Sequence, residues 1–299
     1  MTGSDALVDV AIVTWNTRDT TVQAIASLLA AEPEGTLRVL VRDNASSDGT
    51  AEAVAAAYPE VEVDAGAANL GFAGGVNTIL KRSTAPWCLL LNSDAWPEPG
   101  AISRLVACAE RHPKAAVVVP LLLRPDGALE PSAWPLPSLG VSLGSVLDVT
   151  RHLWPHDTER RVDWAVGAAW LMRRAAIDEL GGLDESLFMY AEDVEWCWRA
   201  KDAGWEVWFT PDAVVRHIGN ASGAQLYGAK QSAAWIANSV RVYRRHHGAV
   251  ATRMWQAANA LGATMQMLRL RADKGEVRKW RAQRRAWWRP SPDLDRQAR

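Results

Sequence analysis

Short apolar runs alternate with amphipathic stretches over the first 120 residues. The apolar runs end on polar residues, and they cover residues 8–14, 37–43, 87–91 and 115–120. Helical patterns lie between them, at residues 19–31, 50–58 and 99–111. Strands that alternate with helices of about 10 to 15 residues are typical of a parallel sheet covered on both faces. We therefore expect an α/β fold with a mostly parallel sheet.

The remaining pattern is less regular and then becomes helical. Residues 121–162 are rich in proline, with a hairpin turn expected at 124–127, and residues 162–174 have the pattern of a strand. A short helix is expected at 193–203, followed by two strands at 205–210 and 213–217. Helices are then expected from 226 to Gly248 and from 249 to 271, before a basic tail.

Polar residues directly follow three of the predicted strands, at Thr14–Asn16, Asp43–Asn44 and Asn92–Asp94. Ligands of open α/β sheets bind beyond the carboxyl ends of the strands, so these stretches should share one rim. Asp43 is equally consistent with a ligand contact and with a turn. The case of Asp94 is stronger, because a hard divalent cation that bridges a diphosphate needs only one or two protein oxygens. Asn92 is the second candidate.

Two further stretches carry candidate chemistry. Residues 69–77 place three glycines near a helix start, which suits either phosphate binding or a tight loop, and the spacing is not that of a dinucleotide fingerprint. Glu192 and Asp193 lie at the mouth of a short helix. Adjacent carboxylates near apolar groups can yield a general base, whereas the structural alternative is that Asp193 caps the helix.

His217 ends the last predicted strand. A histidine in this position is commonly an edge residue with its hydrogen bonds satisfied. Beside a cation held by Asp94, it would instead be a suitable nitrogen ligand.

The charge of the chain is divided unevenly between its two ends. Residues 1–240 carry 18 Lys and Arg against 30 Asp and Glu, whereas residues 241–299 carry 15 against 4. A basic appendage of this kind should meet an anionic surface. Three cysteines without CxxC spacing are expected to be reduced core residues of a cytosolic protein. We expect neither a signal peptide nor a membrane span.

Taken in order, these segments resemble glycosyltransferase family two, in particular its rhamnosyltransferase-like members. The matching parts are IVTWN (12–16), DNASSDGT (43–50), NLGFAGGVN (69–77), LLLNSDA (89–95), GAAWLMRR (167–174), GGLDESLFMYAEDVEWCWR (181–199) and VRH (215–217). The resemblance implies a GT-A fold and inverting transfer from a nucleotide-sugar. It implies a catalytic domain at 1–225, with a nucleotide-sugar half at about 8–120 and an acceptor half at about 121–225. A helical, basic extension would occupy 226–299.

The resemblance also implies roles for single residues. The nucleotide-sugar would be bound by Thr14, Asn16, Asp43, Asn69, Gly71, Asn77, Asn92 and Ser93. Asp94 would bind a divalent cation, Mg²⁺ or Mn²⁺, with His217 completing its shell. Asp193 would be the catalytic base, with Glu192 near the acceptor or donor sugar, and Gly167 and Trp170 would line the sugar pocket. Asn92 departs from the usual Asp-Xaa-Asp pattern, so cation affinity would depend more on the diphosphate.

The basic tail has an aromatic side formed by Val277, Trp280, Trp287 and Trp288. Such a helix suits peripheral contact with an anionic membrane through 273–299, on the inner face of the plasma membrane. Packing on the acidic body and a homodimer contact are the alternatives, and no fold for nucleic-acid recognition accompanies the patch.

The expected function is transfer of L-rhamnose from dTDP-rhamnose, or of a hexose from a UDP-sugar, to a saccharide or polyprenyl-linked acceptor. A sugar-nucleotide nucleotidyltransferase and a non-catalytic nucleotide-sugar binding module are the alternatives. The first would need a basic phosphate loop early in the chain, and the Glu192–Asp193 pair argues against the second.

Overall fold

The computed structural model of the protein describes residues 7–146, 155–219, 230–270 and 273–290. The strands are β1 (Val8–Thr14), β2 (Leu37–Asp43), β3 (Glu62–Ala65), β4 (Trp87–Asn92), β5 (Ala95–Pro97), β6 (Ala115–Leu123), β7 (Leu129–Glu130), β8 (Ala133–Trp134), β9 (Arg160–Val162), β10 (Trp164–Ala165), β11 (Ala169–Arg173) and β12 (Glu206–His217). The helices are α1 (Arg18–Ala31), α2 (Thr50–Ala57), α3 (Gly71–Leu80), α4 (Ala101–Arg111), α5 (Leu139–Val146), α6 (Arg174–Leu180), α7 (Glu192–Asp202), α9 (Gln231–Arg269) and α10 (Lys274–Trp288).

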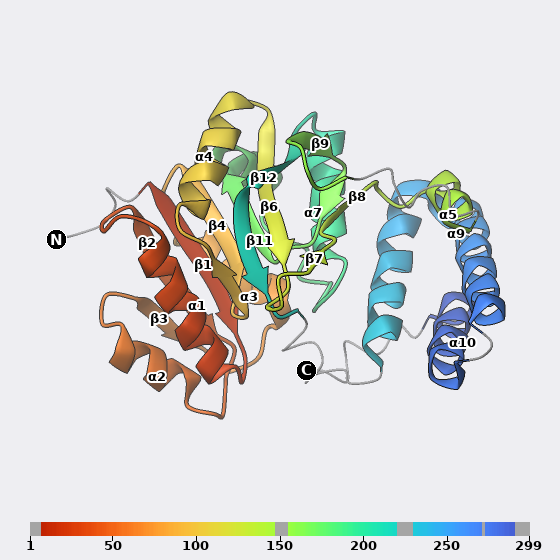
Figure 1. Ribbon diagram of the computed structural model, residues 1–299, viewed down its shortest axis with the longest axis horizontal. Helices are drawn as coiled ribbons and strands as arrows, with labels where there is room; N and C mark the ends of the chain where they lie inside the picture. The colour runs from red at the N-terminus through yellow and green to blue at the C-terminus, as the bar shows by residue number, and fades with distance from the viewer. Residues whose placement is uncertain (1–6, 147–154, 220–229, 271–272, 291–299) are drawn as a thin grey trace.

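One large twisted sheet forms the centre of the molecule (Figure 1). Its order is β3-β2-β1-β4-β11-β6-β12-β5, with β7 paired to β6 and β9 paired to β12. Strands β3, β2, β1 and β4 are parallel, as are β6 and β12, while β11 and β5 run antiparallel to their neighbours. The mostly parallel sheet expected from the sequence is confirmed.

The sheet has an apolar core on each face because successive side chains of a strand point to opposite sides. On β4, Leu89 and Leu91 pack into one core, and Cys88 and Leu90 pack into the other. Helices α1 and α4 cover the first face, and α3, α6 and α7 cover the second. The three cysteines are free and buried, as predicted.

The fold departs from the predicted elements in its second half. The single strand expected over 162–174 is divided, because Val166–Ala168 separate β10 from β11. The two strands expected at 205–210 and 213–217 are one strand, β12, with a register shift between Thr210 and Val214. Strand β5 has no counterpart among the predicted elements. The hairpin turn at 124–127 is confirmed, since the Gly127 N–H donates to the Arg124 carbonyl.

The C-terminal helices pack beside the sheet body rather than trailing away from it (Figure 1). Gly248 has φ 74° and ψ −178° and interrupts α9, at the position where the sequence predicts the end of a helix. The two halves of α9 therefore fold back on each other. Tyr243 of the first half stacks on Trp255 of the second at 4.3 Å between ring centroids. The predicted boundary at 225/226 lies outside the described residues.

Part of the aromatic side of α10 packs against α9. Trp287 is buried, lies 4.9 Å from Trp255, and accepts a hydrogen bond at its carbonyl from Gln256. Trp288 is exposed. The prediction that Trp287 forms part of a membrane-contacting side is therefore wrong, because the same apolar side finds a partner within the protein. In the described part of the chain, no helix combines the length and apolarity needed to cross a bilayer.

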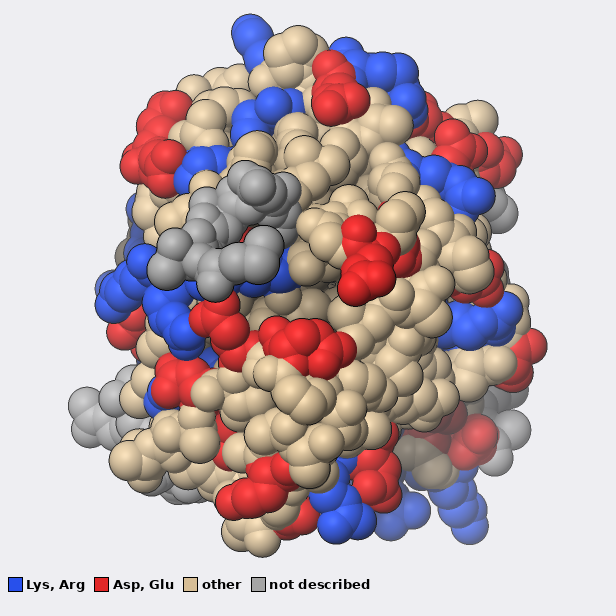
Figure 2. All heavy atoms as spheres, turned by 90° about the vertical axis from the view of Figure 1, so that its left-hand side faces the viewer, with Lys and Arg blue, Asp and Glu red and all other residues tan. Residues whose placement is uncertain are grey.

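The two ends of the molecule differ in surface character. At the end opposite the C-terminal helices, acidic and basic side chains are intermingled over the surface (Figure 2). Exposed charges that form pairs include Arg82 with Glu62 and Arg18 with Asp19.

Candidate active site

A cavity of about 470 Å³ lies at the carboxyl edge of the sheet, between the strand ends and the C-terminal helices. Its sheet side includes Asn92, Ser93, Asp94, Gly167, Glu192, Asp193 and His217. These are the predicted catalytic and metal-binding residues together with three of those expected to bind sugar or nucleotide. Asp94 and Asp193, separated by 99 positions in the chain, thus face one cavity.

The pairing of β5 with β12 sets Asp94 against His217. Ala95 lies opposite His217 in the antiparallel register, and the Ile218 N–H donates to the Asp94 carbonyl. The His217 Nε2 lies 3.3 Å from Asp94 Oδ1 and 3.4 Å from Asn92 Nδ2. Both Asp94 and His217 are buried. The strand that the sequence did not predict is therefore the element that brings the two candidate ligands together.

Glu130 holds the other ring nitrogen of His217. Its carboxylate lies 3.2 Å from His217 Nδ1, and it comes from β7, at the end of the hairpin that follows β6. Burial alone would lower the pKa of His217, but hydrogen bonds and charge from Asp94 and Glu130 raise it from 6.5 to about 9. Carboxylates that orient a histidine in this way are usual around metal-binding imidazoles. Sequence reasoning missed Glu130, which lies in the segment predicted to be irregular.

The donor set fits a divalent cation. A carboxylate oxygen and an imidazole nitrogen 3.3 Å apart match two neighbouring ligands of an ion bound at about 2.1 Å from each. The amide of Asn92 lies beside them. Asp94 and His217 are therefore the residues that would hold such an ion, with Glu130 fixing the ring.

Asp193 lies at the start of α7, half-buried in the cavity wall. Loss of solvent raises the pKa of its carboxyl group from 3.8 to about 6, against backbone N–H groups of Val194 and Gly167 that favour the ionised form. A Cβ added at Gly167 would lie 3.8 Å from the Asp193 Cβ, which is an ordinary contact distance. A carboxylate with this pKa is ionised at neutral pH and still basic enough to accept a proton.

The backbone before α7 is held in an uncommon conformation. Tyr190 and Ala191 have φ 75° and 68°, although neither residue is glycine or asparagine. Such residues cost about 1–3 kcal/mol each and persist only where surrounding contacts impose them. Two hydrogen bonds from α9 hold this segment: Gln231 Nε2 donates to the Tyr190 hydroxyl, and Asn238 Nδ2 donates to the Met189 carbonyl. The first half of α9 therefore sets the direction in which Glu192 and Asp193 enter the cavity.

The ends of β1 and β4 are joined by a buried hydroxyl network. Thr14 Oγ1 lies 2.8 Å from Thr17 Oγ1 and 2.9 Å from Thr21 Oγ1, and Thr17 Oγ1 lies 3.1 Å from Ser93 Oγ. Thr14 is buried and does not line the cavity. Thr14 is linked to the cavity lining through Thr17 and Ser93.

The ends of β1 and β2 are joined by a second network. Asp43 accepts hydrogen bonds from the Ser46 N–H and hydroxyl, and the Ser46 hydroxyl accepts from the Asn16 N–H at 2.8 Å. Asn16 Oδ1 accepts from the Ser47 N–H at 2.7 Å, with Asn16 in the left-handed region at φ 51°. The common rim expected from the sequence is present, and the nucleotide-binding roles of Asn16 and Asp43 stay predictions.

Three more residues predicted to bind the nucleotide-sugar, Asn69, Gly71 and Asn77, make structural contacts outside the cavity. Asn69 Oδ1 accepts from the Gly71 N–H, and a Cβ on Gly71 would lie 2.3 Å from the Phe188 carbonyl oxygen. Asn77 bonds both the N–H and the carbonyl of Leu183. These residues fix α3 against the loop before α7, and whether they also contact a donor is untested.

The expectation that Trp170 lines the sugar pocket is wrong. Its side chain is fully buried, does not line the cavity and packs against Trp196 of α7 at 6.0 Å between centroids. The physical reason is that α7 covers this face of β11, so the indole lies beneath the helix.

Sequence reasoning also missed the aromatic side of the cavity. Trp134 and Trp164 stack 4.9 Å apart on the small β8–β10 sheet. Trp235 of α9 and Trp287 of α10 line the cavity from the other side. Their only signal in the sequence is the abundance of tryptophan, 16 residues in all, which does not indicate which of them share a wall.

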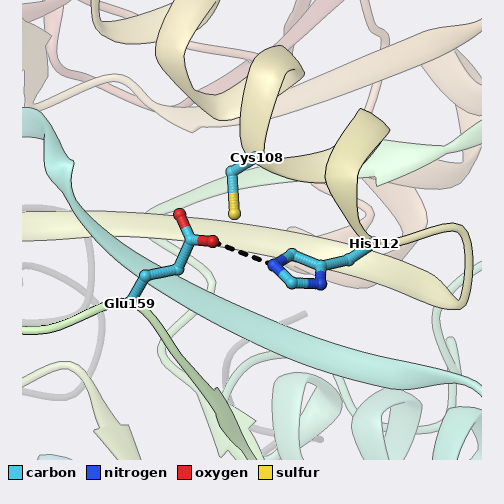
Figure 3. A group of neighbouring side chains, drawn as sticks. All are labelled: Cys108, His112 and Glu159. Atoms are coloured by element: carbon cyan, nitrogen blue, oxygen red, sulfur yellow. Dashed lines mark hydrogen bonds and ion pairs between the residues drawn. The ribbon is translucent and has the colours of Figure 1, made fainter.

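A separate polar cluster lies at the end of α4 (Figure 3). Cys108, His112 and Glu159 place one ligand atom each within 4.8 Å of one another. His112 bonds Glu159 at 2.9 Å and stacks on Trp208, and Arg111 also bonds the Glu159 carboxylate. Although burial opposes ionisation, these hydrogen bonds lower the pKa of Glu159 to about 2. Because an arginine already neutralises the carboxylate, the cluster is best explained as an anchor for the segment before β9.

Comparison with known proteins decides the family. The profile of "Glycosyl transferase family 2" matches residues 9–181, and that of "Glycosyl transferase family 21" matches residues 153–271. The chain belongs to glycosyl transferase family 2. It is therefore a glycosyltransferase, as the resemblance predicted, and its α/β body has the GT-A fold.

Curated relatives and solved structures agree with this assignment. The chain is 35% identical over 217 residues to the Mycobacterium tuberculosis N-acetylglucosaminyl-diphospho-decaprenol L-rhamnosyltransferase, covering 64% of this chain and 70% of the relative. It is 30% identical over 187 residues to the pre-mycofactocin glycosyltransferase of the same organism, covering 60% of this chain and 37% of that protein.

Among solved structures, a Pyrobaculum calidifontis mannosyltransferase in complex with GDP-Man and Mn²⁺ superposes with a TM-score of 0.60 at 17% identity, covering 94% of this chain and 85% of that one. S. aureus TarS superposes with a TM-score of 0.53 at 15% identity, covering 95% and 92%. At these identities, the likeness shows the shared fold.

Proposed function

We propose that this glycosyltransferase is a cation-dependent, inverting enzyme that transfers L-rhamnose from dTDP-rhamnose to a hydroxyl of a lipid-linked saccharide. The observation that carries the proposal is the single cavity that Asp94, His217 and Asp193 share. The similar mycobacterial relative is named for L-rhamnosyl transfer to a decaprenol-linked N-acetylglucosamine, which supports this donor and acceptor class. Transfer of a hexose from a UDP-sugar is the alternative donor chemistry.

Asp193 performs the proton transfer in this proposal. Its carboxylate accepts the proton of the acceptor hydroxyl while that oxygen bonds to the anomeric carbon and the bond from this carbon to the diphosphate oxygen breaks. The N–H groups of Val194 and Gly167 orient the carboxylate, and its pKa near 6 keeps it ionised and basic at neutral pH. Attack on the face opposite the diphosphate inverts the anomeric centre.

Asp94 and His217 bind the cation, and Glu130 fixes the tautomer and direction of the imidazole ring. A divalent ion bound there supplies positive charge for the departing diphosphate. Asn92 in place of a carboxylate leaves less negative charge around the ion, so donor and cation should bind cooperatively.

The test is transfer by the full-length chain from dTDP-rhamnose and from UDP-sugars to a lipid-linked N-acetylglucosamine acceptor, with and without Mn²⁺ or Mg²⁺. The proposal expects cation-dependent transfer from dTDP-rhamnose with inversion, as determined by nuclear magnetic resonance of the product linkage. Retention of configuration, or full activity after exhaustive chelation, would overturn the corresponding part of it.

A further inference from the structure

The second half of α9, residues 249–269, has an apolar outer face. Val250, Met254, Leu261 and Leu268 are 78%, 53%, 51% and 68% exposed. Their spacing of four, seven and seven residues places them on one side of the helix. Most exposed hydrophobic side chains of a protein are scattered, whereas a continuous apolar patch marks a contact surface.

The opposite face of this helix segment already has partners. Trp255 and Gln256 are buried against α10, and Asn259 donates to the Ser142 hydroxyl of α5. The outer face therefore does not contribute to the protein's own core. From 254 to 268 the segment has no charged residue, and Arg253 and Arg269 flank it.

The neighbouring α10 presents a basic outer face. Arg278, Arg281 and Arg285 are exposed and recur every three or four residues, on the side away from the buried Trp287. Because Trp287 packs on α9, this row points away from α9 and is not part of the apolar face. The apolar row of α9 is complementary to an apolar layer beneath anionic head groups, because it is uncharged from 254 to 268 and has an exposed arginine, Arg253 or Arg269, at each end.

We infer that the outer face of residues 249–269, with Arg253 and Arg269 at its ends, lies on the surface of an anionic bilayer. This surface differs from the aromatic side predicted for α10, whose Trp287 is buried. Figure 1 shows these helices at the end of the molecule opposite the N-terminus, and the charges at that opposite end are mixed (Figure 2).

The position of the cavity agrees with this orientation. The first half of α9 lines it through Gln231 and Trp235, and α10 lines it through Gln283 and Trp287. Helix α9 would thus meet the bilayer through its second half and line the cavity through its first half. A lipid-linked acceptor could enter from the bilayer along this helix, and this last step rests on the proposed function, whereas membrane contact itself does not.

Flotation of the full-length protein with vesicles of equal parts phosphatidylglycerol and phosphatidylcholine tests the inference. Leu261→Glu with Leu268→Glu should reduce the bound fraction about tenfold or more, because two carboxylates would enter the interface. Arg253→Gln with Arg269→Gln should weaken binding to these vesicles and reduce its salt dependence. The matched controls are Leu7→Glu, an exposed leucine at the other end, and Arg82→Gln with Arg104→Gln.

A dye on Leu268→Cys gives an independent readout, since the three native cysteines are buried. A polarity-sensitive fluorophore there should shift to the blue with anionic vesicles, whereas the same dye on Leu7→Cys should not. Wild-type binding by the α9 variants, or no blue shift at position 268, overturns the inference. A change from dimer to monomer in sedimentation with unchanged vesicle binding would also overturn it, by assigning the face to a second copy. Because no donor is present, these outcomes are independent of the transfer reaction.

Discussion

The two walls of the cavity are built from different chemistry. The sheet wall carries carboxylates, an imidazole and small residues, all placed by strand ends and the start of α7. The helical wall, with Trp235, Trp287 and the amides of Gln231 and Gln283, carries no charged side chain among its described residues. We propose from this difference that the sheet wall performs the reaction and that the helical wall recognises the acceptor.

Among the changes to the sheet wall, Asp193→Asn should reduce the transfer rate the most. Loss of general-base help should reduce transfer about 10²–10⁴-fold, while donor affinity measured by calorimetry stays within about twofold. Asp202→Asn, at the far end of α7 and 62% exposed in its side chain, is the matched control and should retain transfer. In the wild type, the rate should fall as the pH drops below about 6, because Asp193 then becomes protonated. Normal turnover by the Asp193→Asn variant would remove Asp193 from the mechanism.

Glu130→Gln tests the role of the sheet wall in cation binding. Removing the charge that orients His217 should weaken Mn²⁺ affinity about 10–100-fold, as measured by electron paramagnetic resonance of free Mn²⁺. Glu98→Gln is the control, because Glu98 pairs with Arg216, the residue before His217, and does not contact the ring. Equal affinities in the two variants would contradict the assignment of Glu130.

Trp235→Leu should affect recognition more than chemistry. Loss of an aromatic surface from the helical wall should raise the KM for the lipid-linked acceptor about tenfold, with hydrolysis of the donor by water unchanged. Trp288→Leu changes an exposed indole outside the cavity and should leave both rates as they are. If Trp235→Leu slows donor hydrolysis as strongly as transfer, the division of labour between the walls is wrong.

The smallest expected effect is on stability. Folding raises the pKa of Asp193 from 3.8 to about 6, so the folded state favours the protonated carboxyl group. The stability that comes from this preference is complete below pH 3.8 and is lost as the pH rises through 6. Asparagine imitates the protonated form. Asp193→Asn should therefore raise Tm by roughly 2–4 °C at pH 8 and hardly at pH 4. An equal increase in Tm at pH 4 and at pH 8 would show that the Asp193 carboxyl group is not desolvated.

The sheet wall was largely predictable from the sequence, whereas the helical wall was not. Strands 8–14 and 37–43 have the predicted bounds, because continuous aliphatic runs between turn residues permit few alternatives. Asp94 and Asp193 face one cavity as expected, since strand ends of such a sheet converge at one edge. Strand β5 was missed because three residues, Ala-Trp-Pro, have no periodicity of their own and are a strand only through pairing with β12.

The helical wall depends on contacts between distant segments. The amphipathic pattern of residues 274–288 indicated an aromatic side but not its partner, and α9 occupies that side. Trp170 resembled a pocket residue in its motif, yet whether an indole faces a cavity or a covering helix is decided by tertiary packing. Glu130 lies 87 positions from His217, with no pattern to connect them.

The central claim, that a cation and a proton acceptor act on one sugar–phosphate bond, is tested most directly by a crystal structure with Mn²⁺ and an unreactive dTDP-rhamnose analogue. The account predicts an anomalous peak for Mn²⁺ within bonding distance of Asp94 Oδ1 and His217 Nε2. The diphosphate should contact the ion, and the anomeric carbon should lie between the diphosphate and Asp193. A donor whose anomeric carbon faces away from Asp193, or an ion bound by other residues, would contradict it.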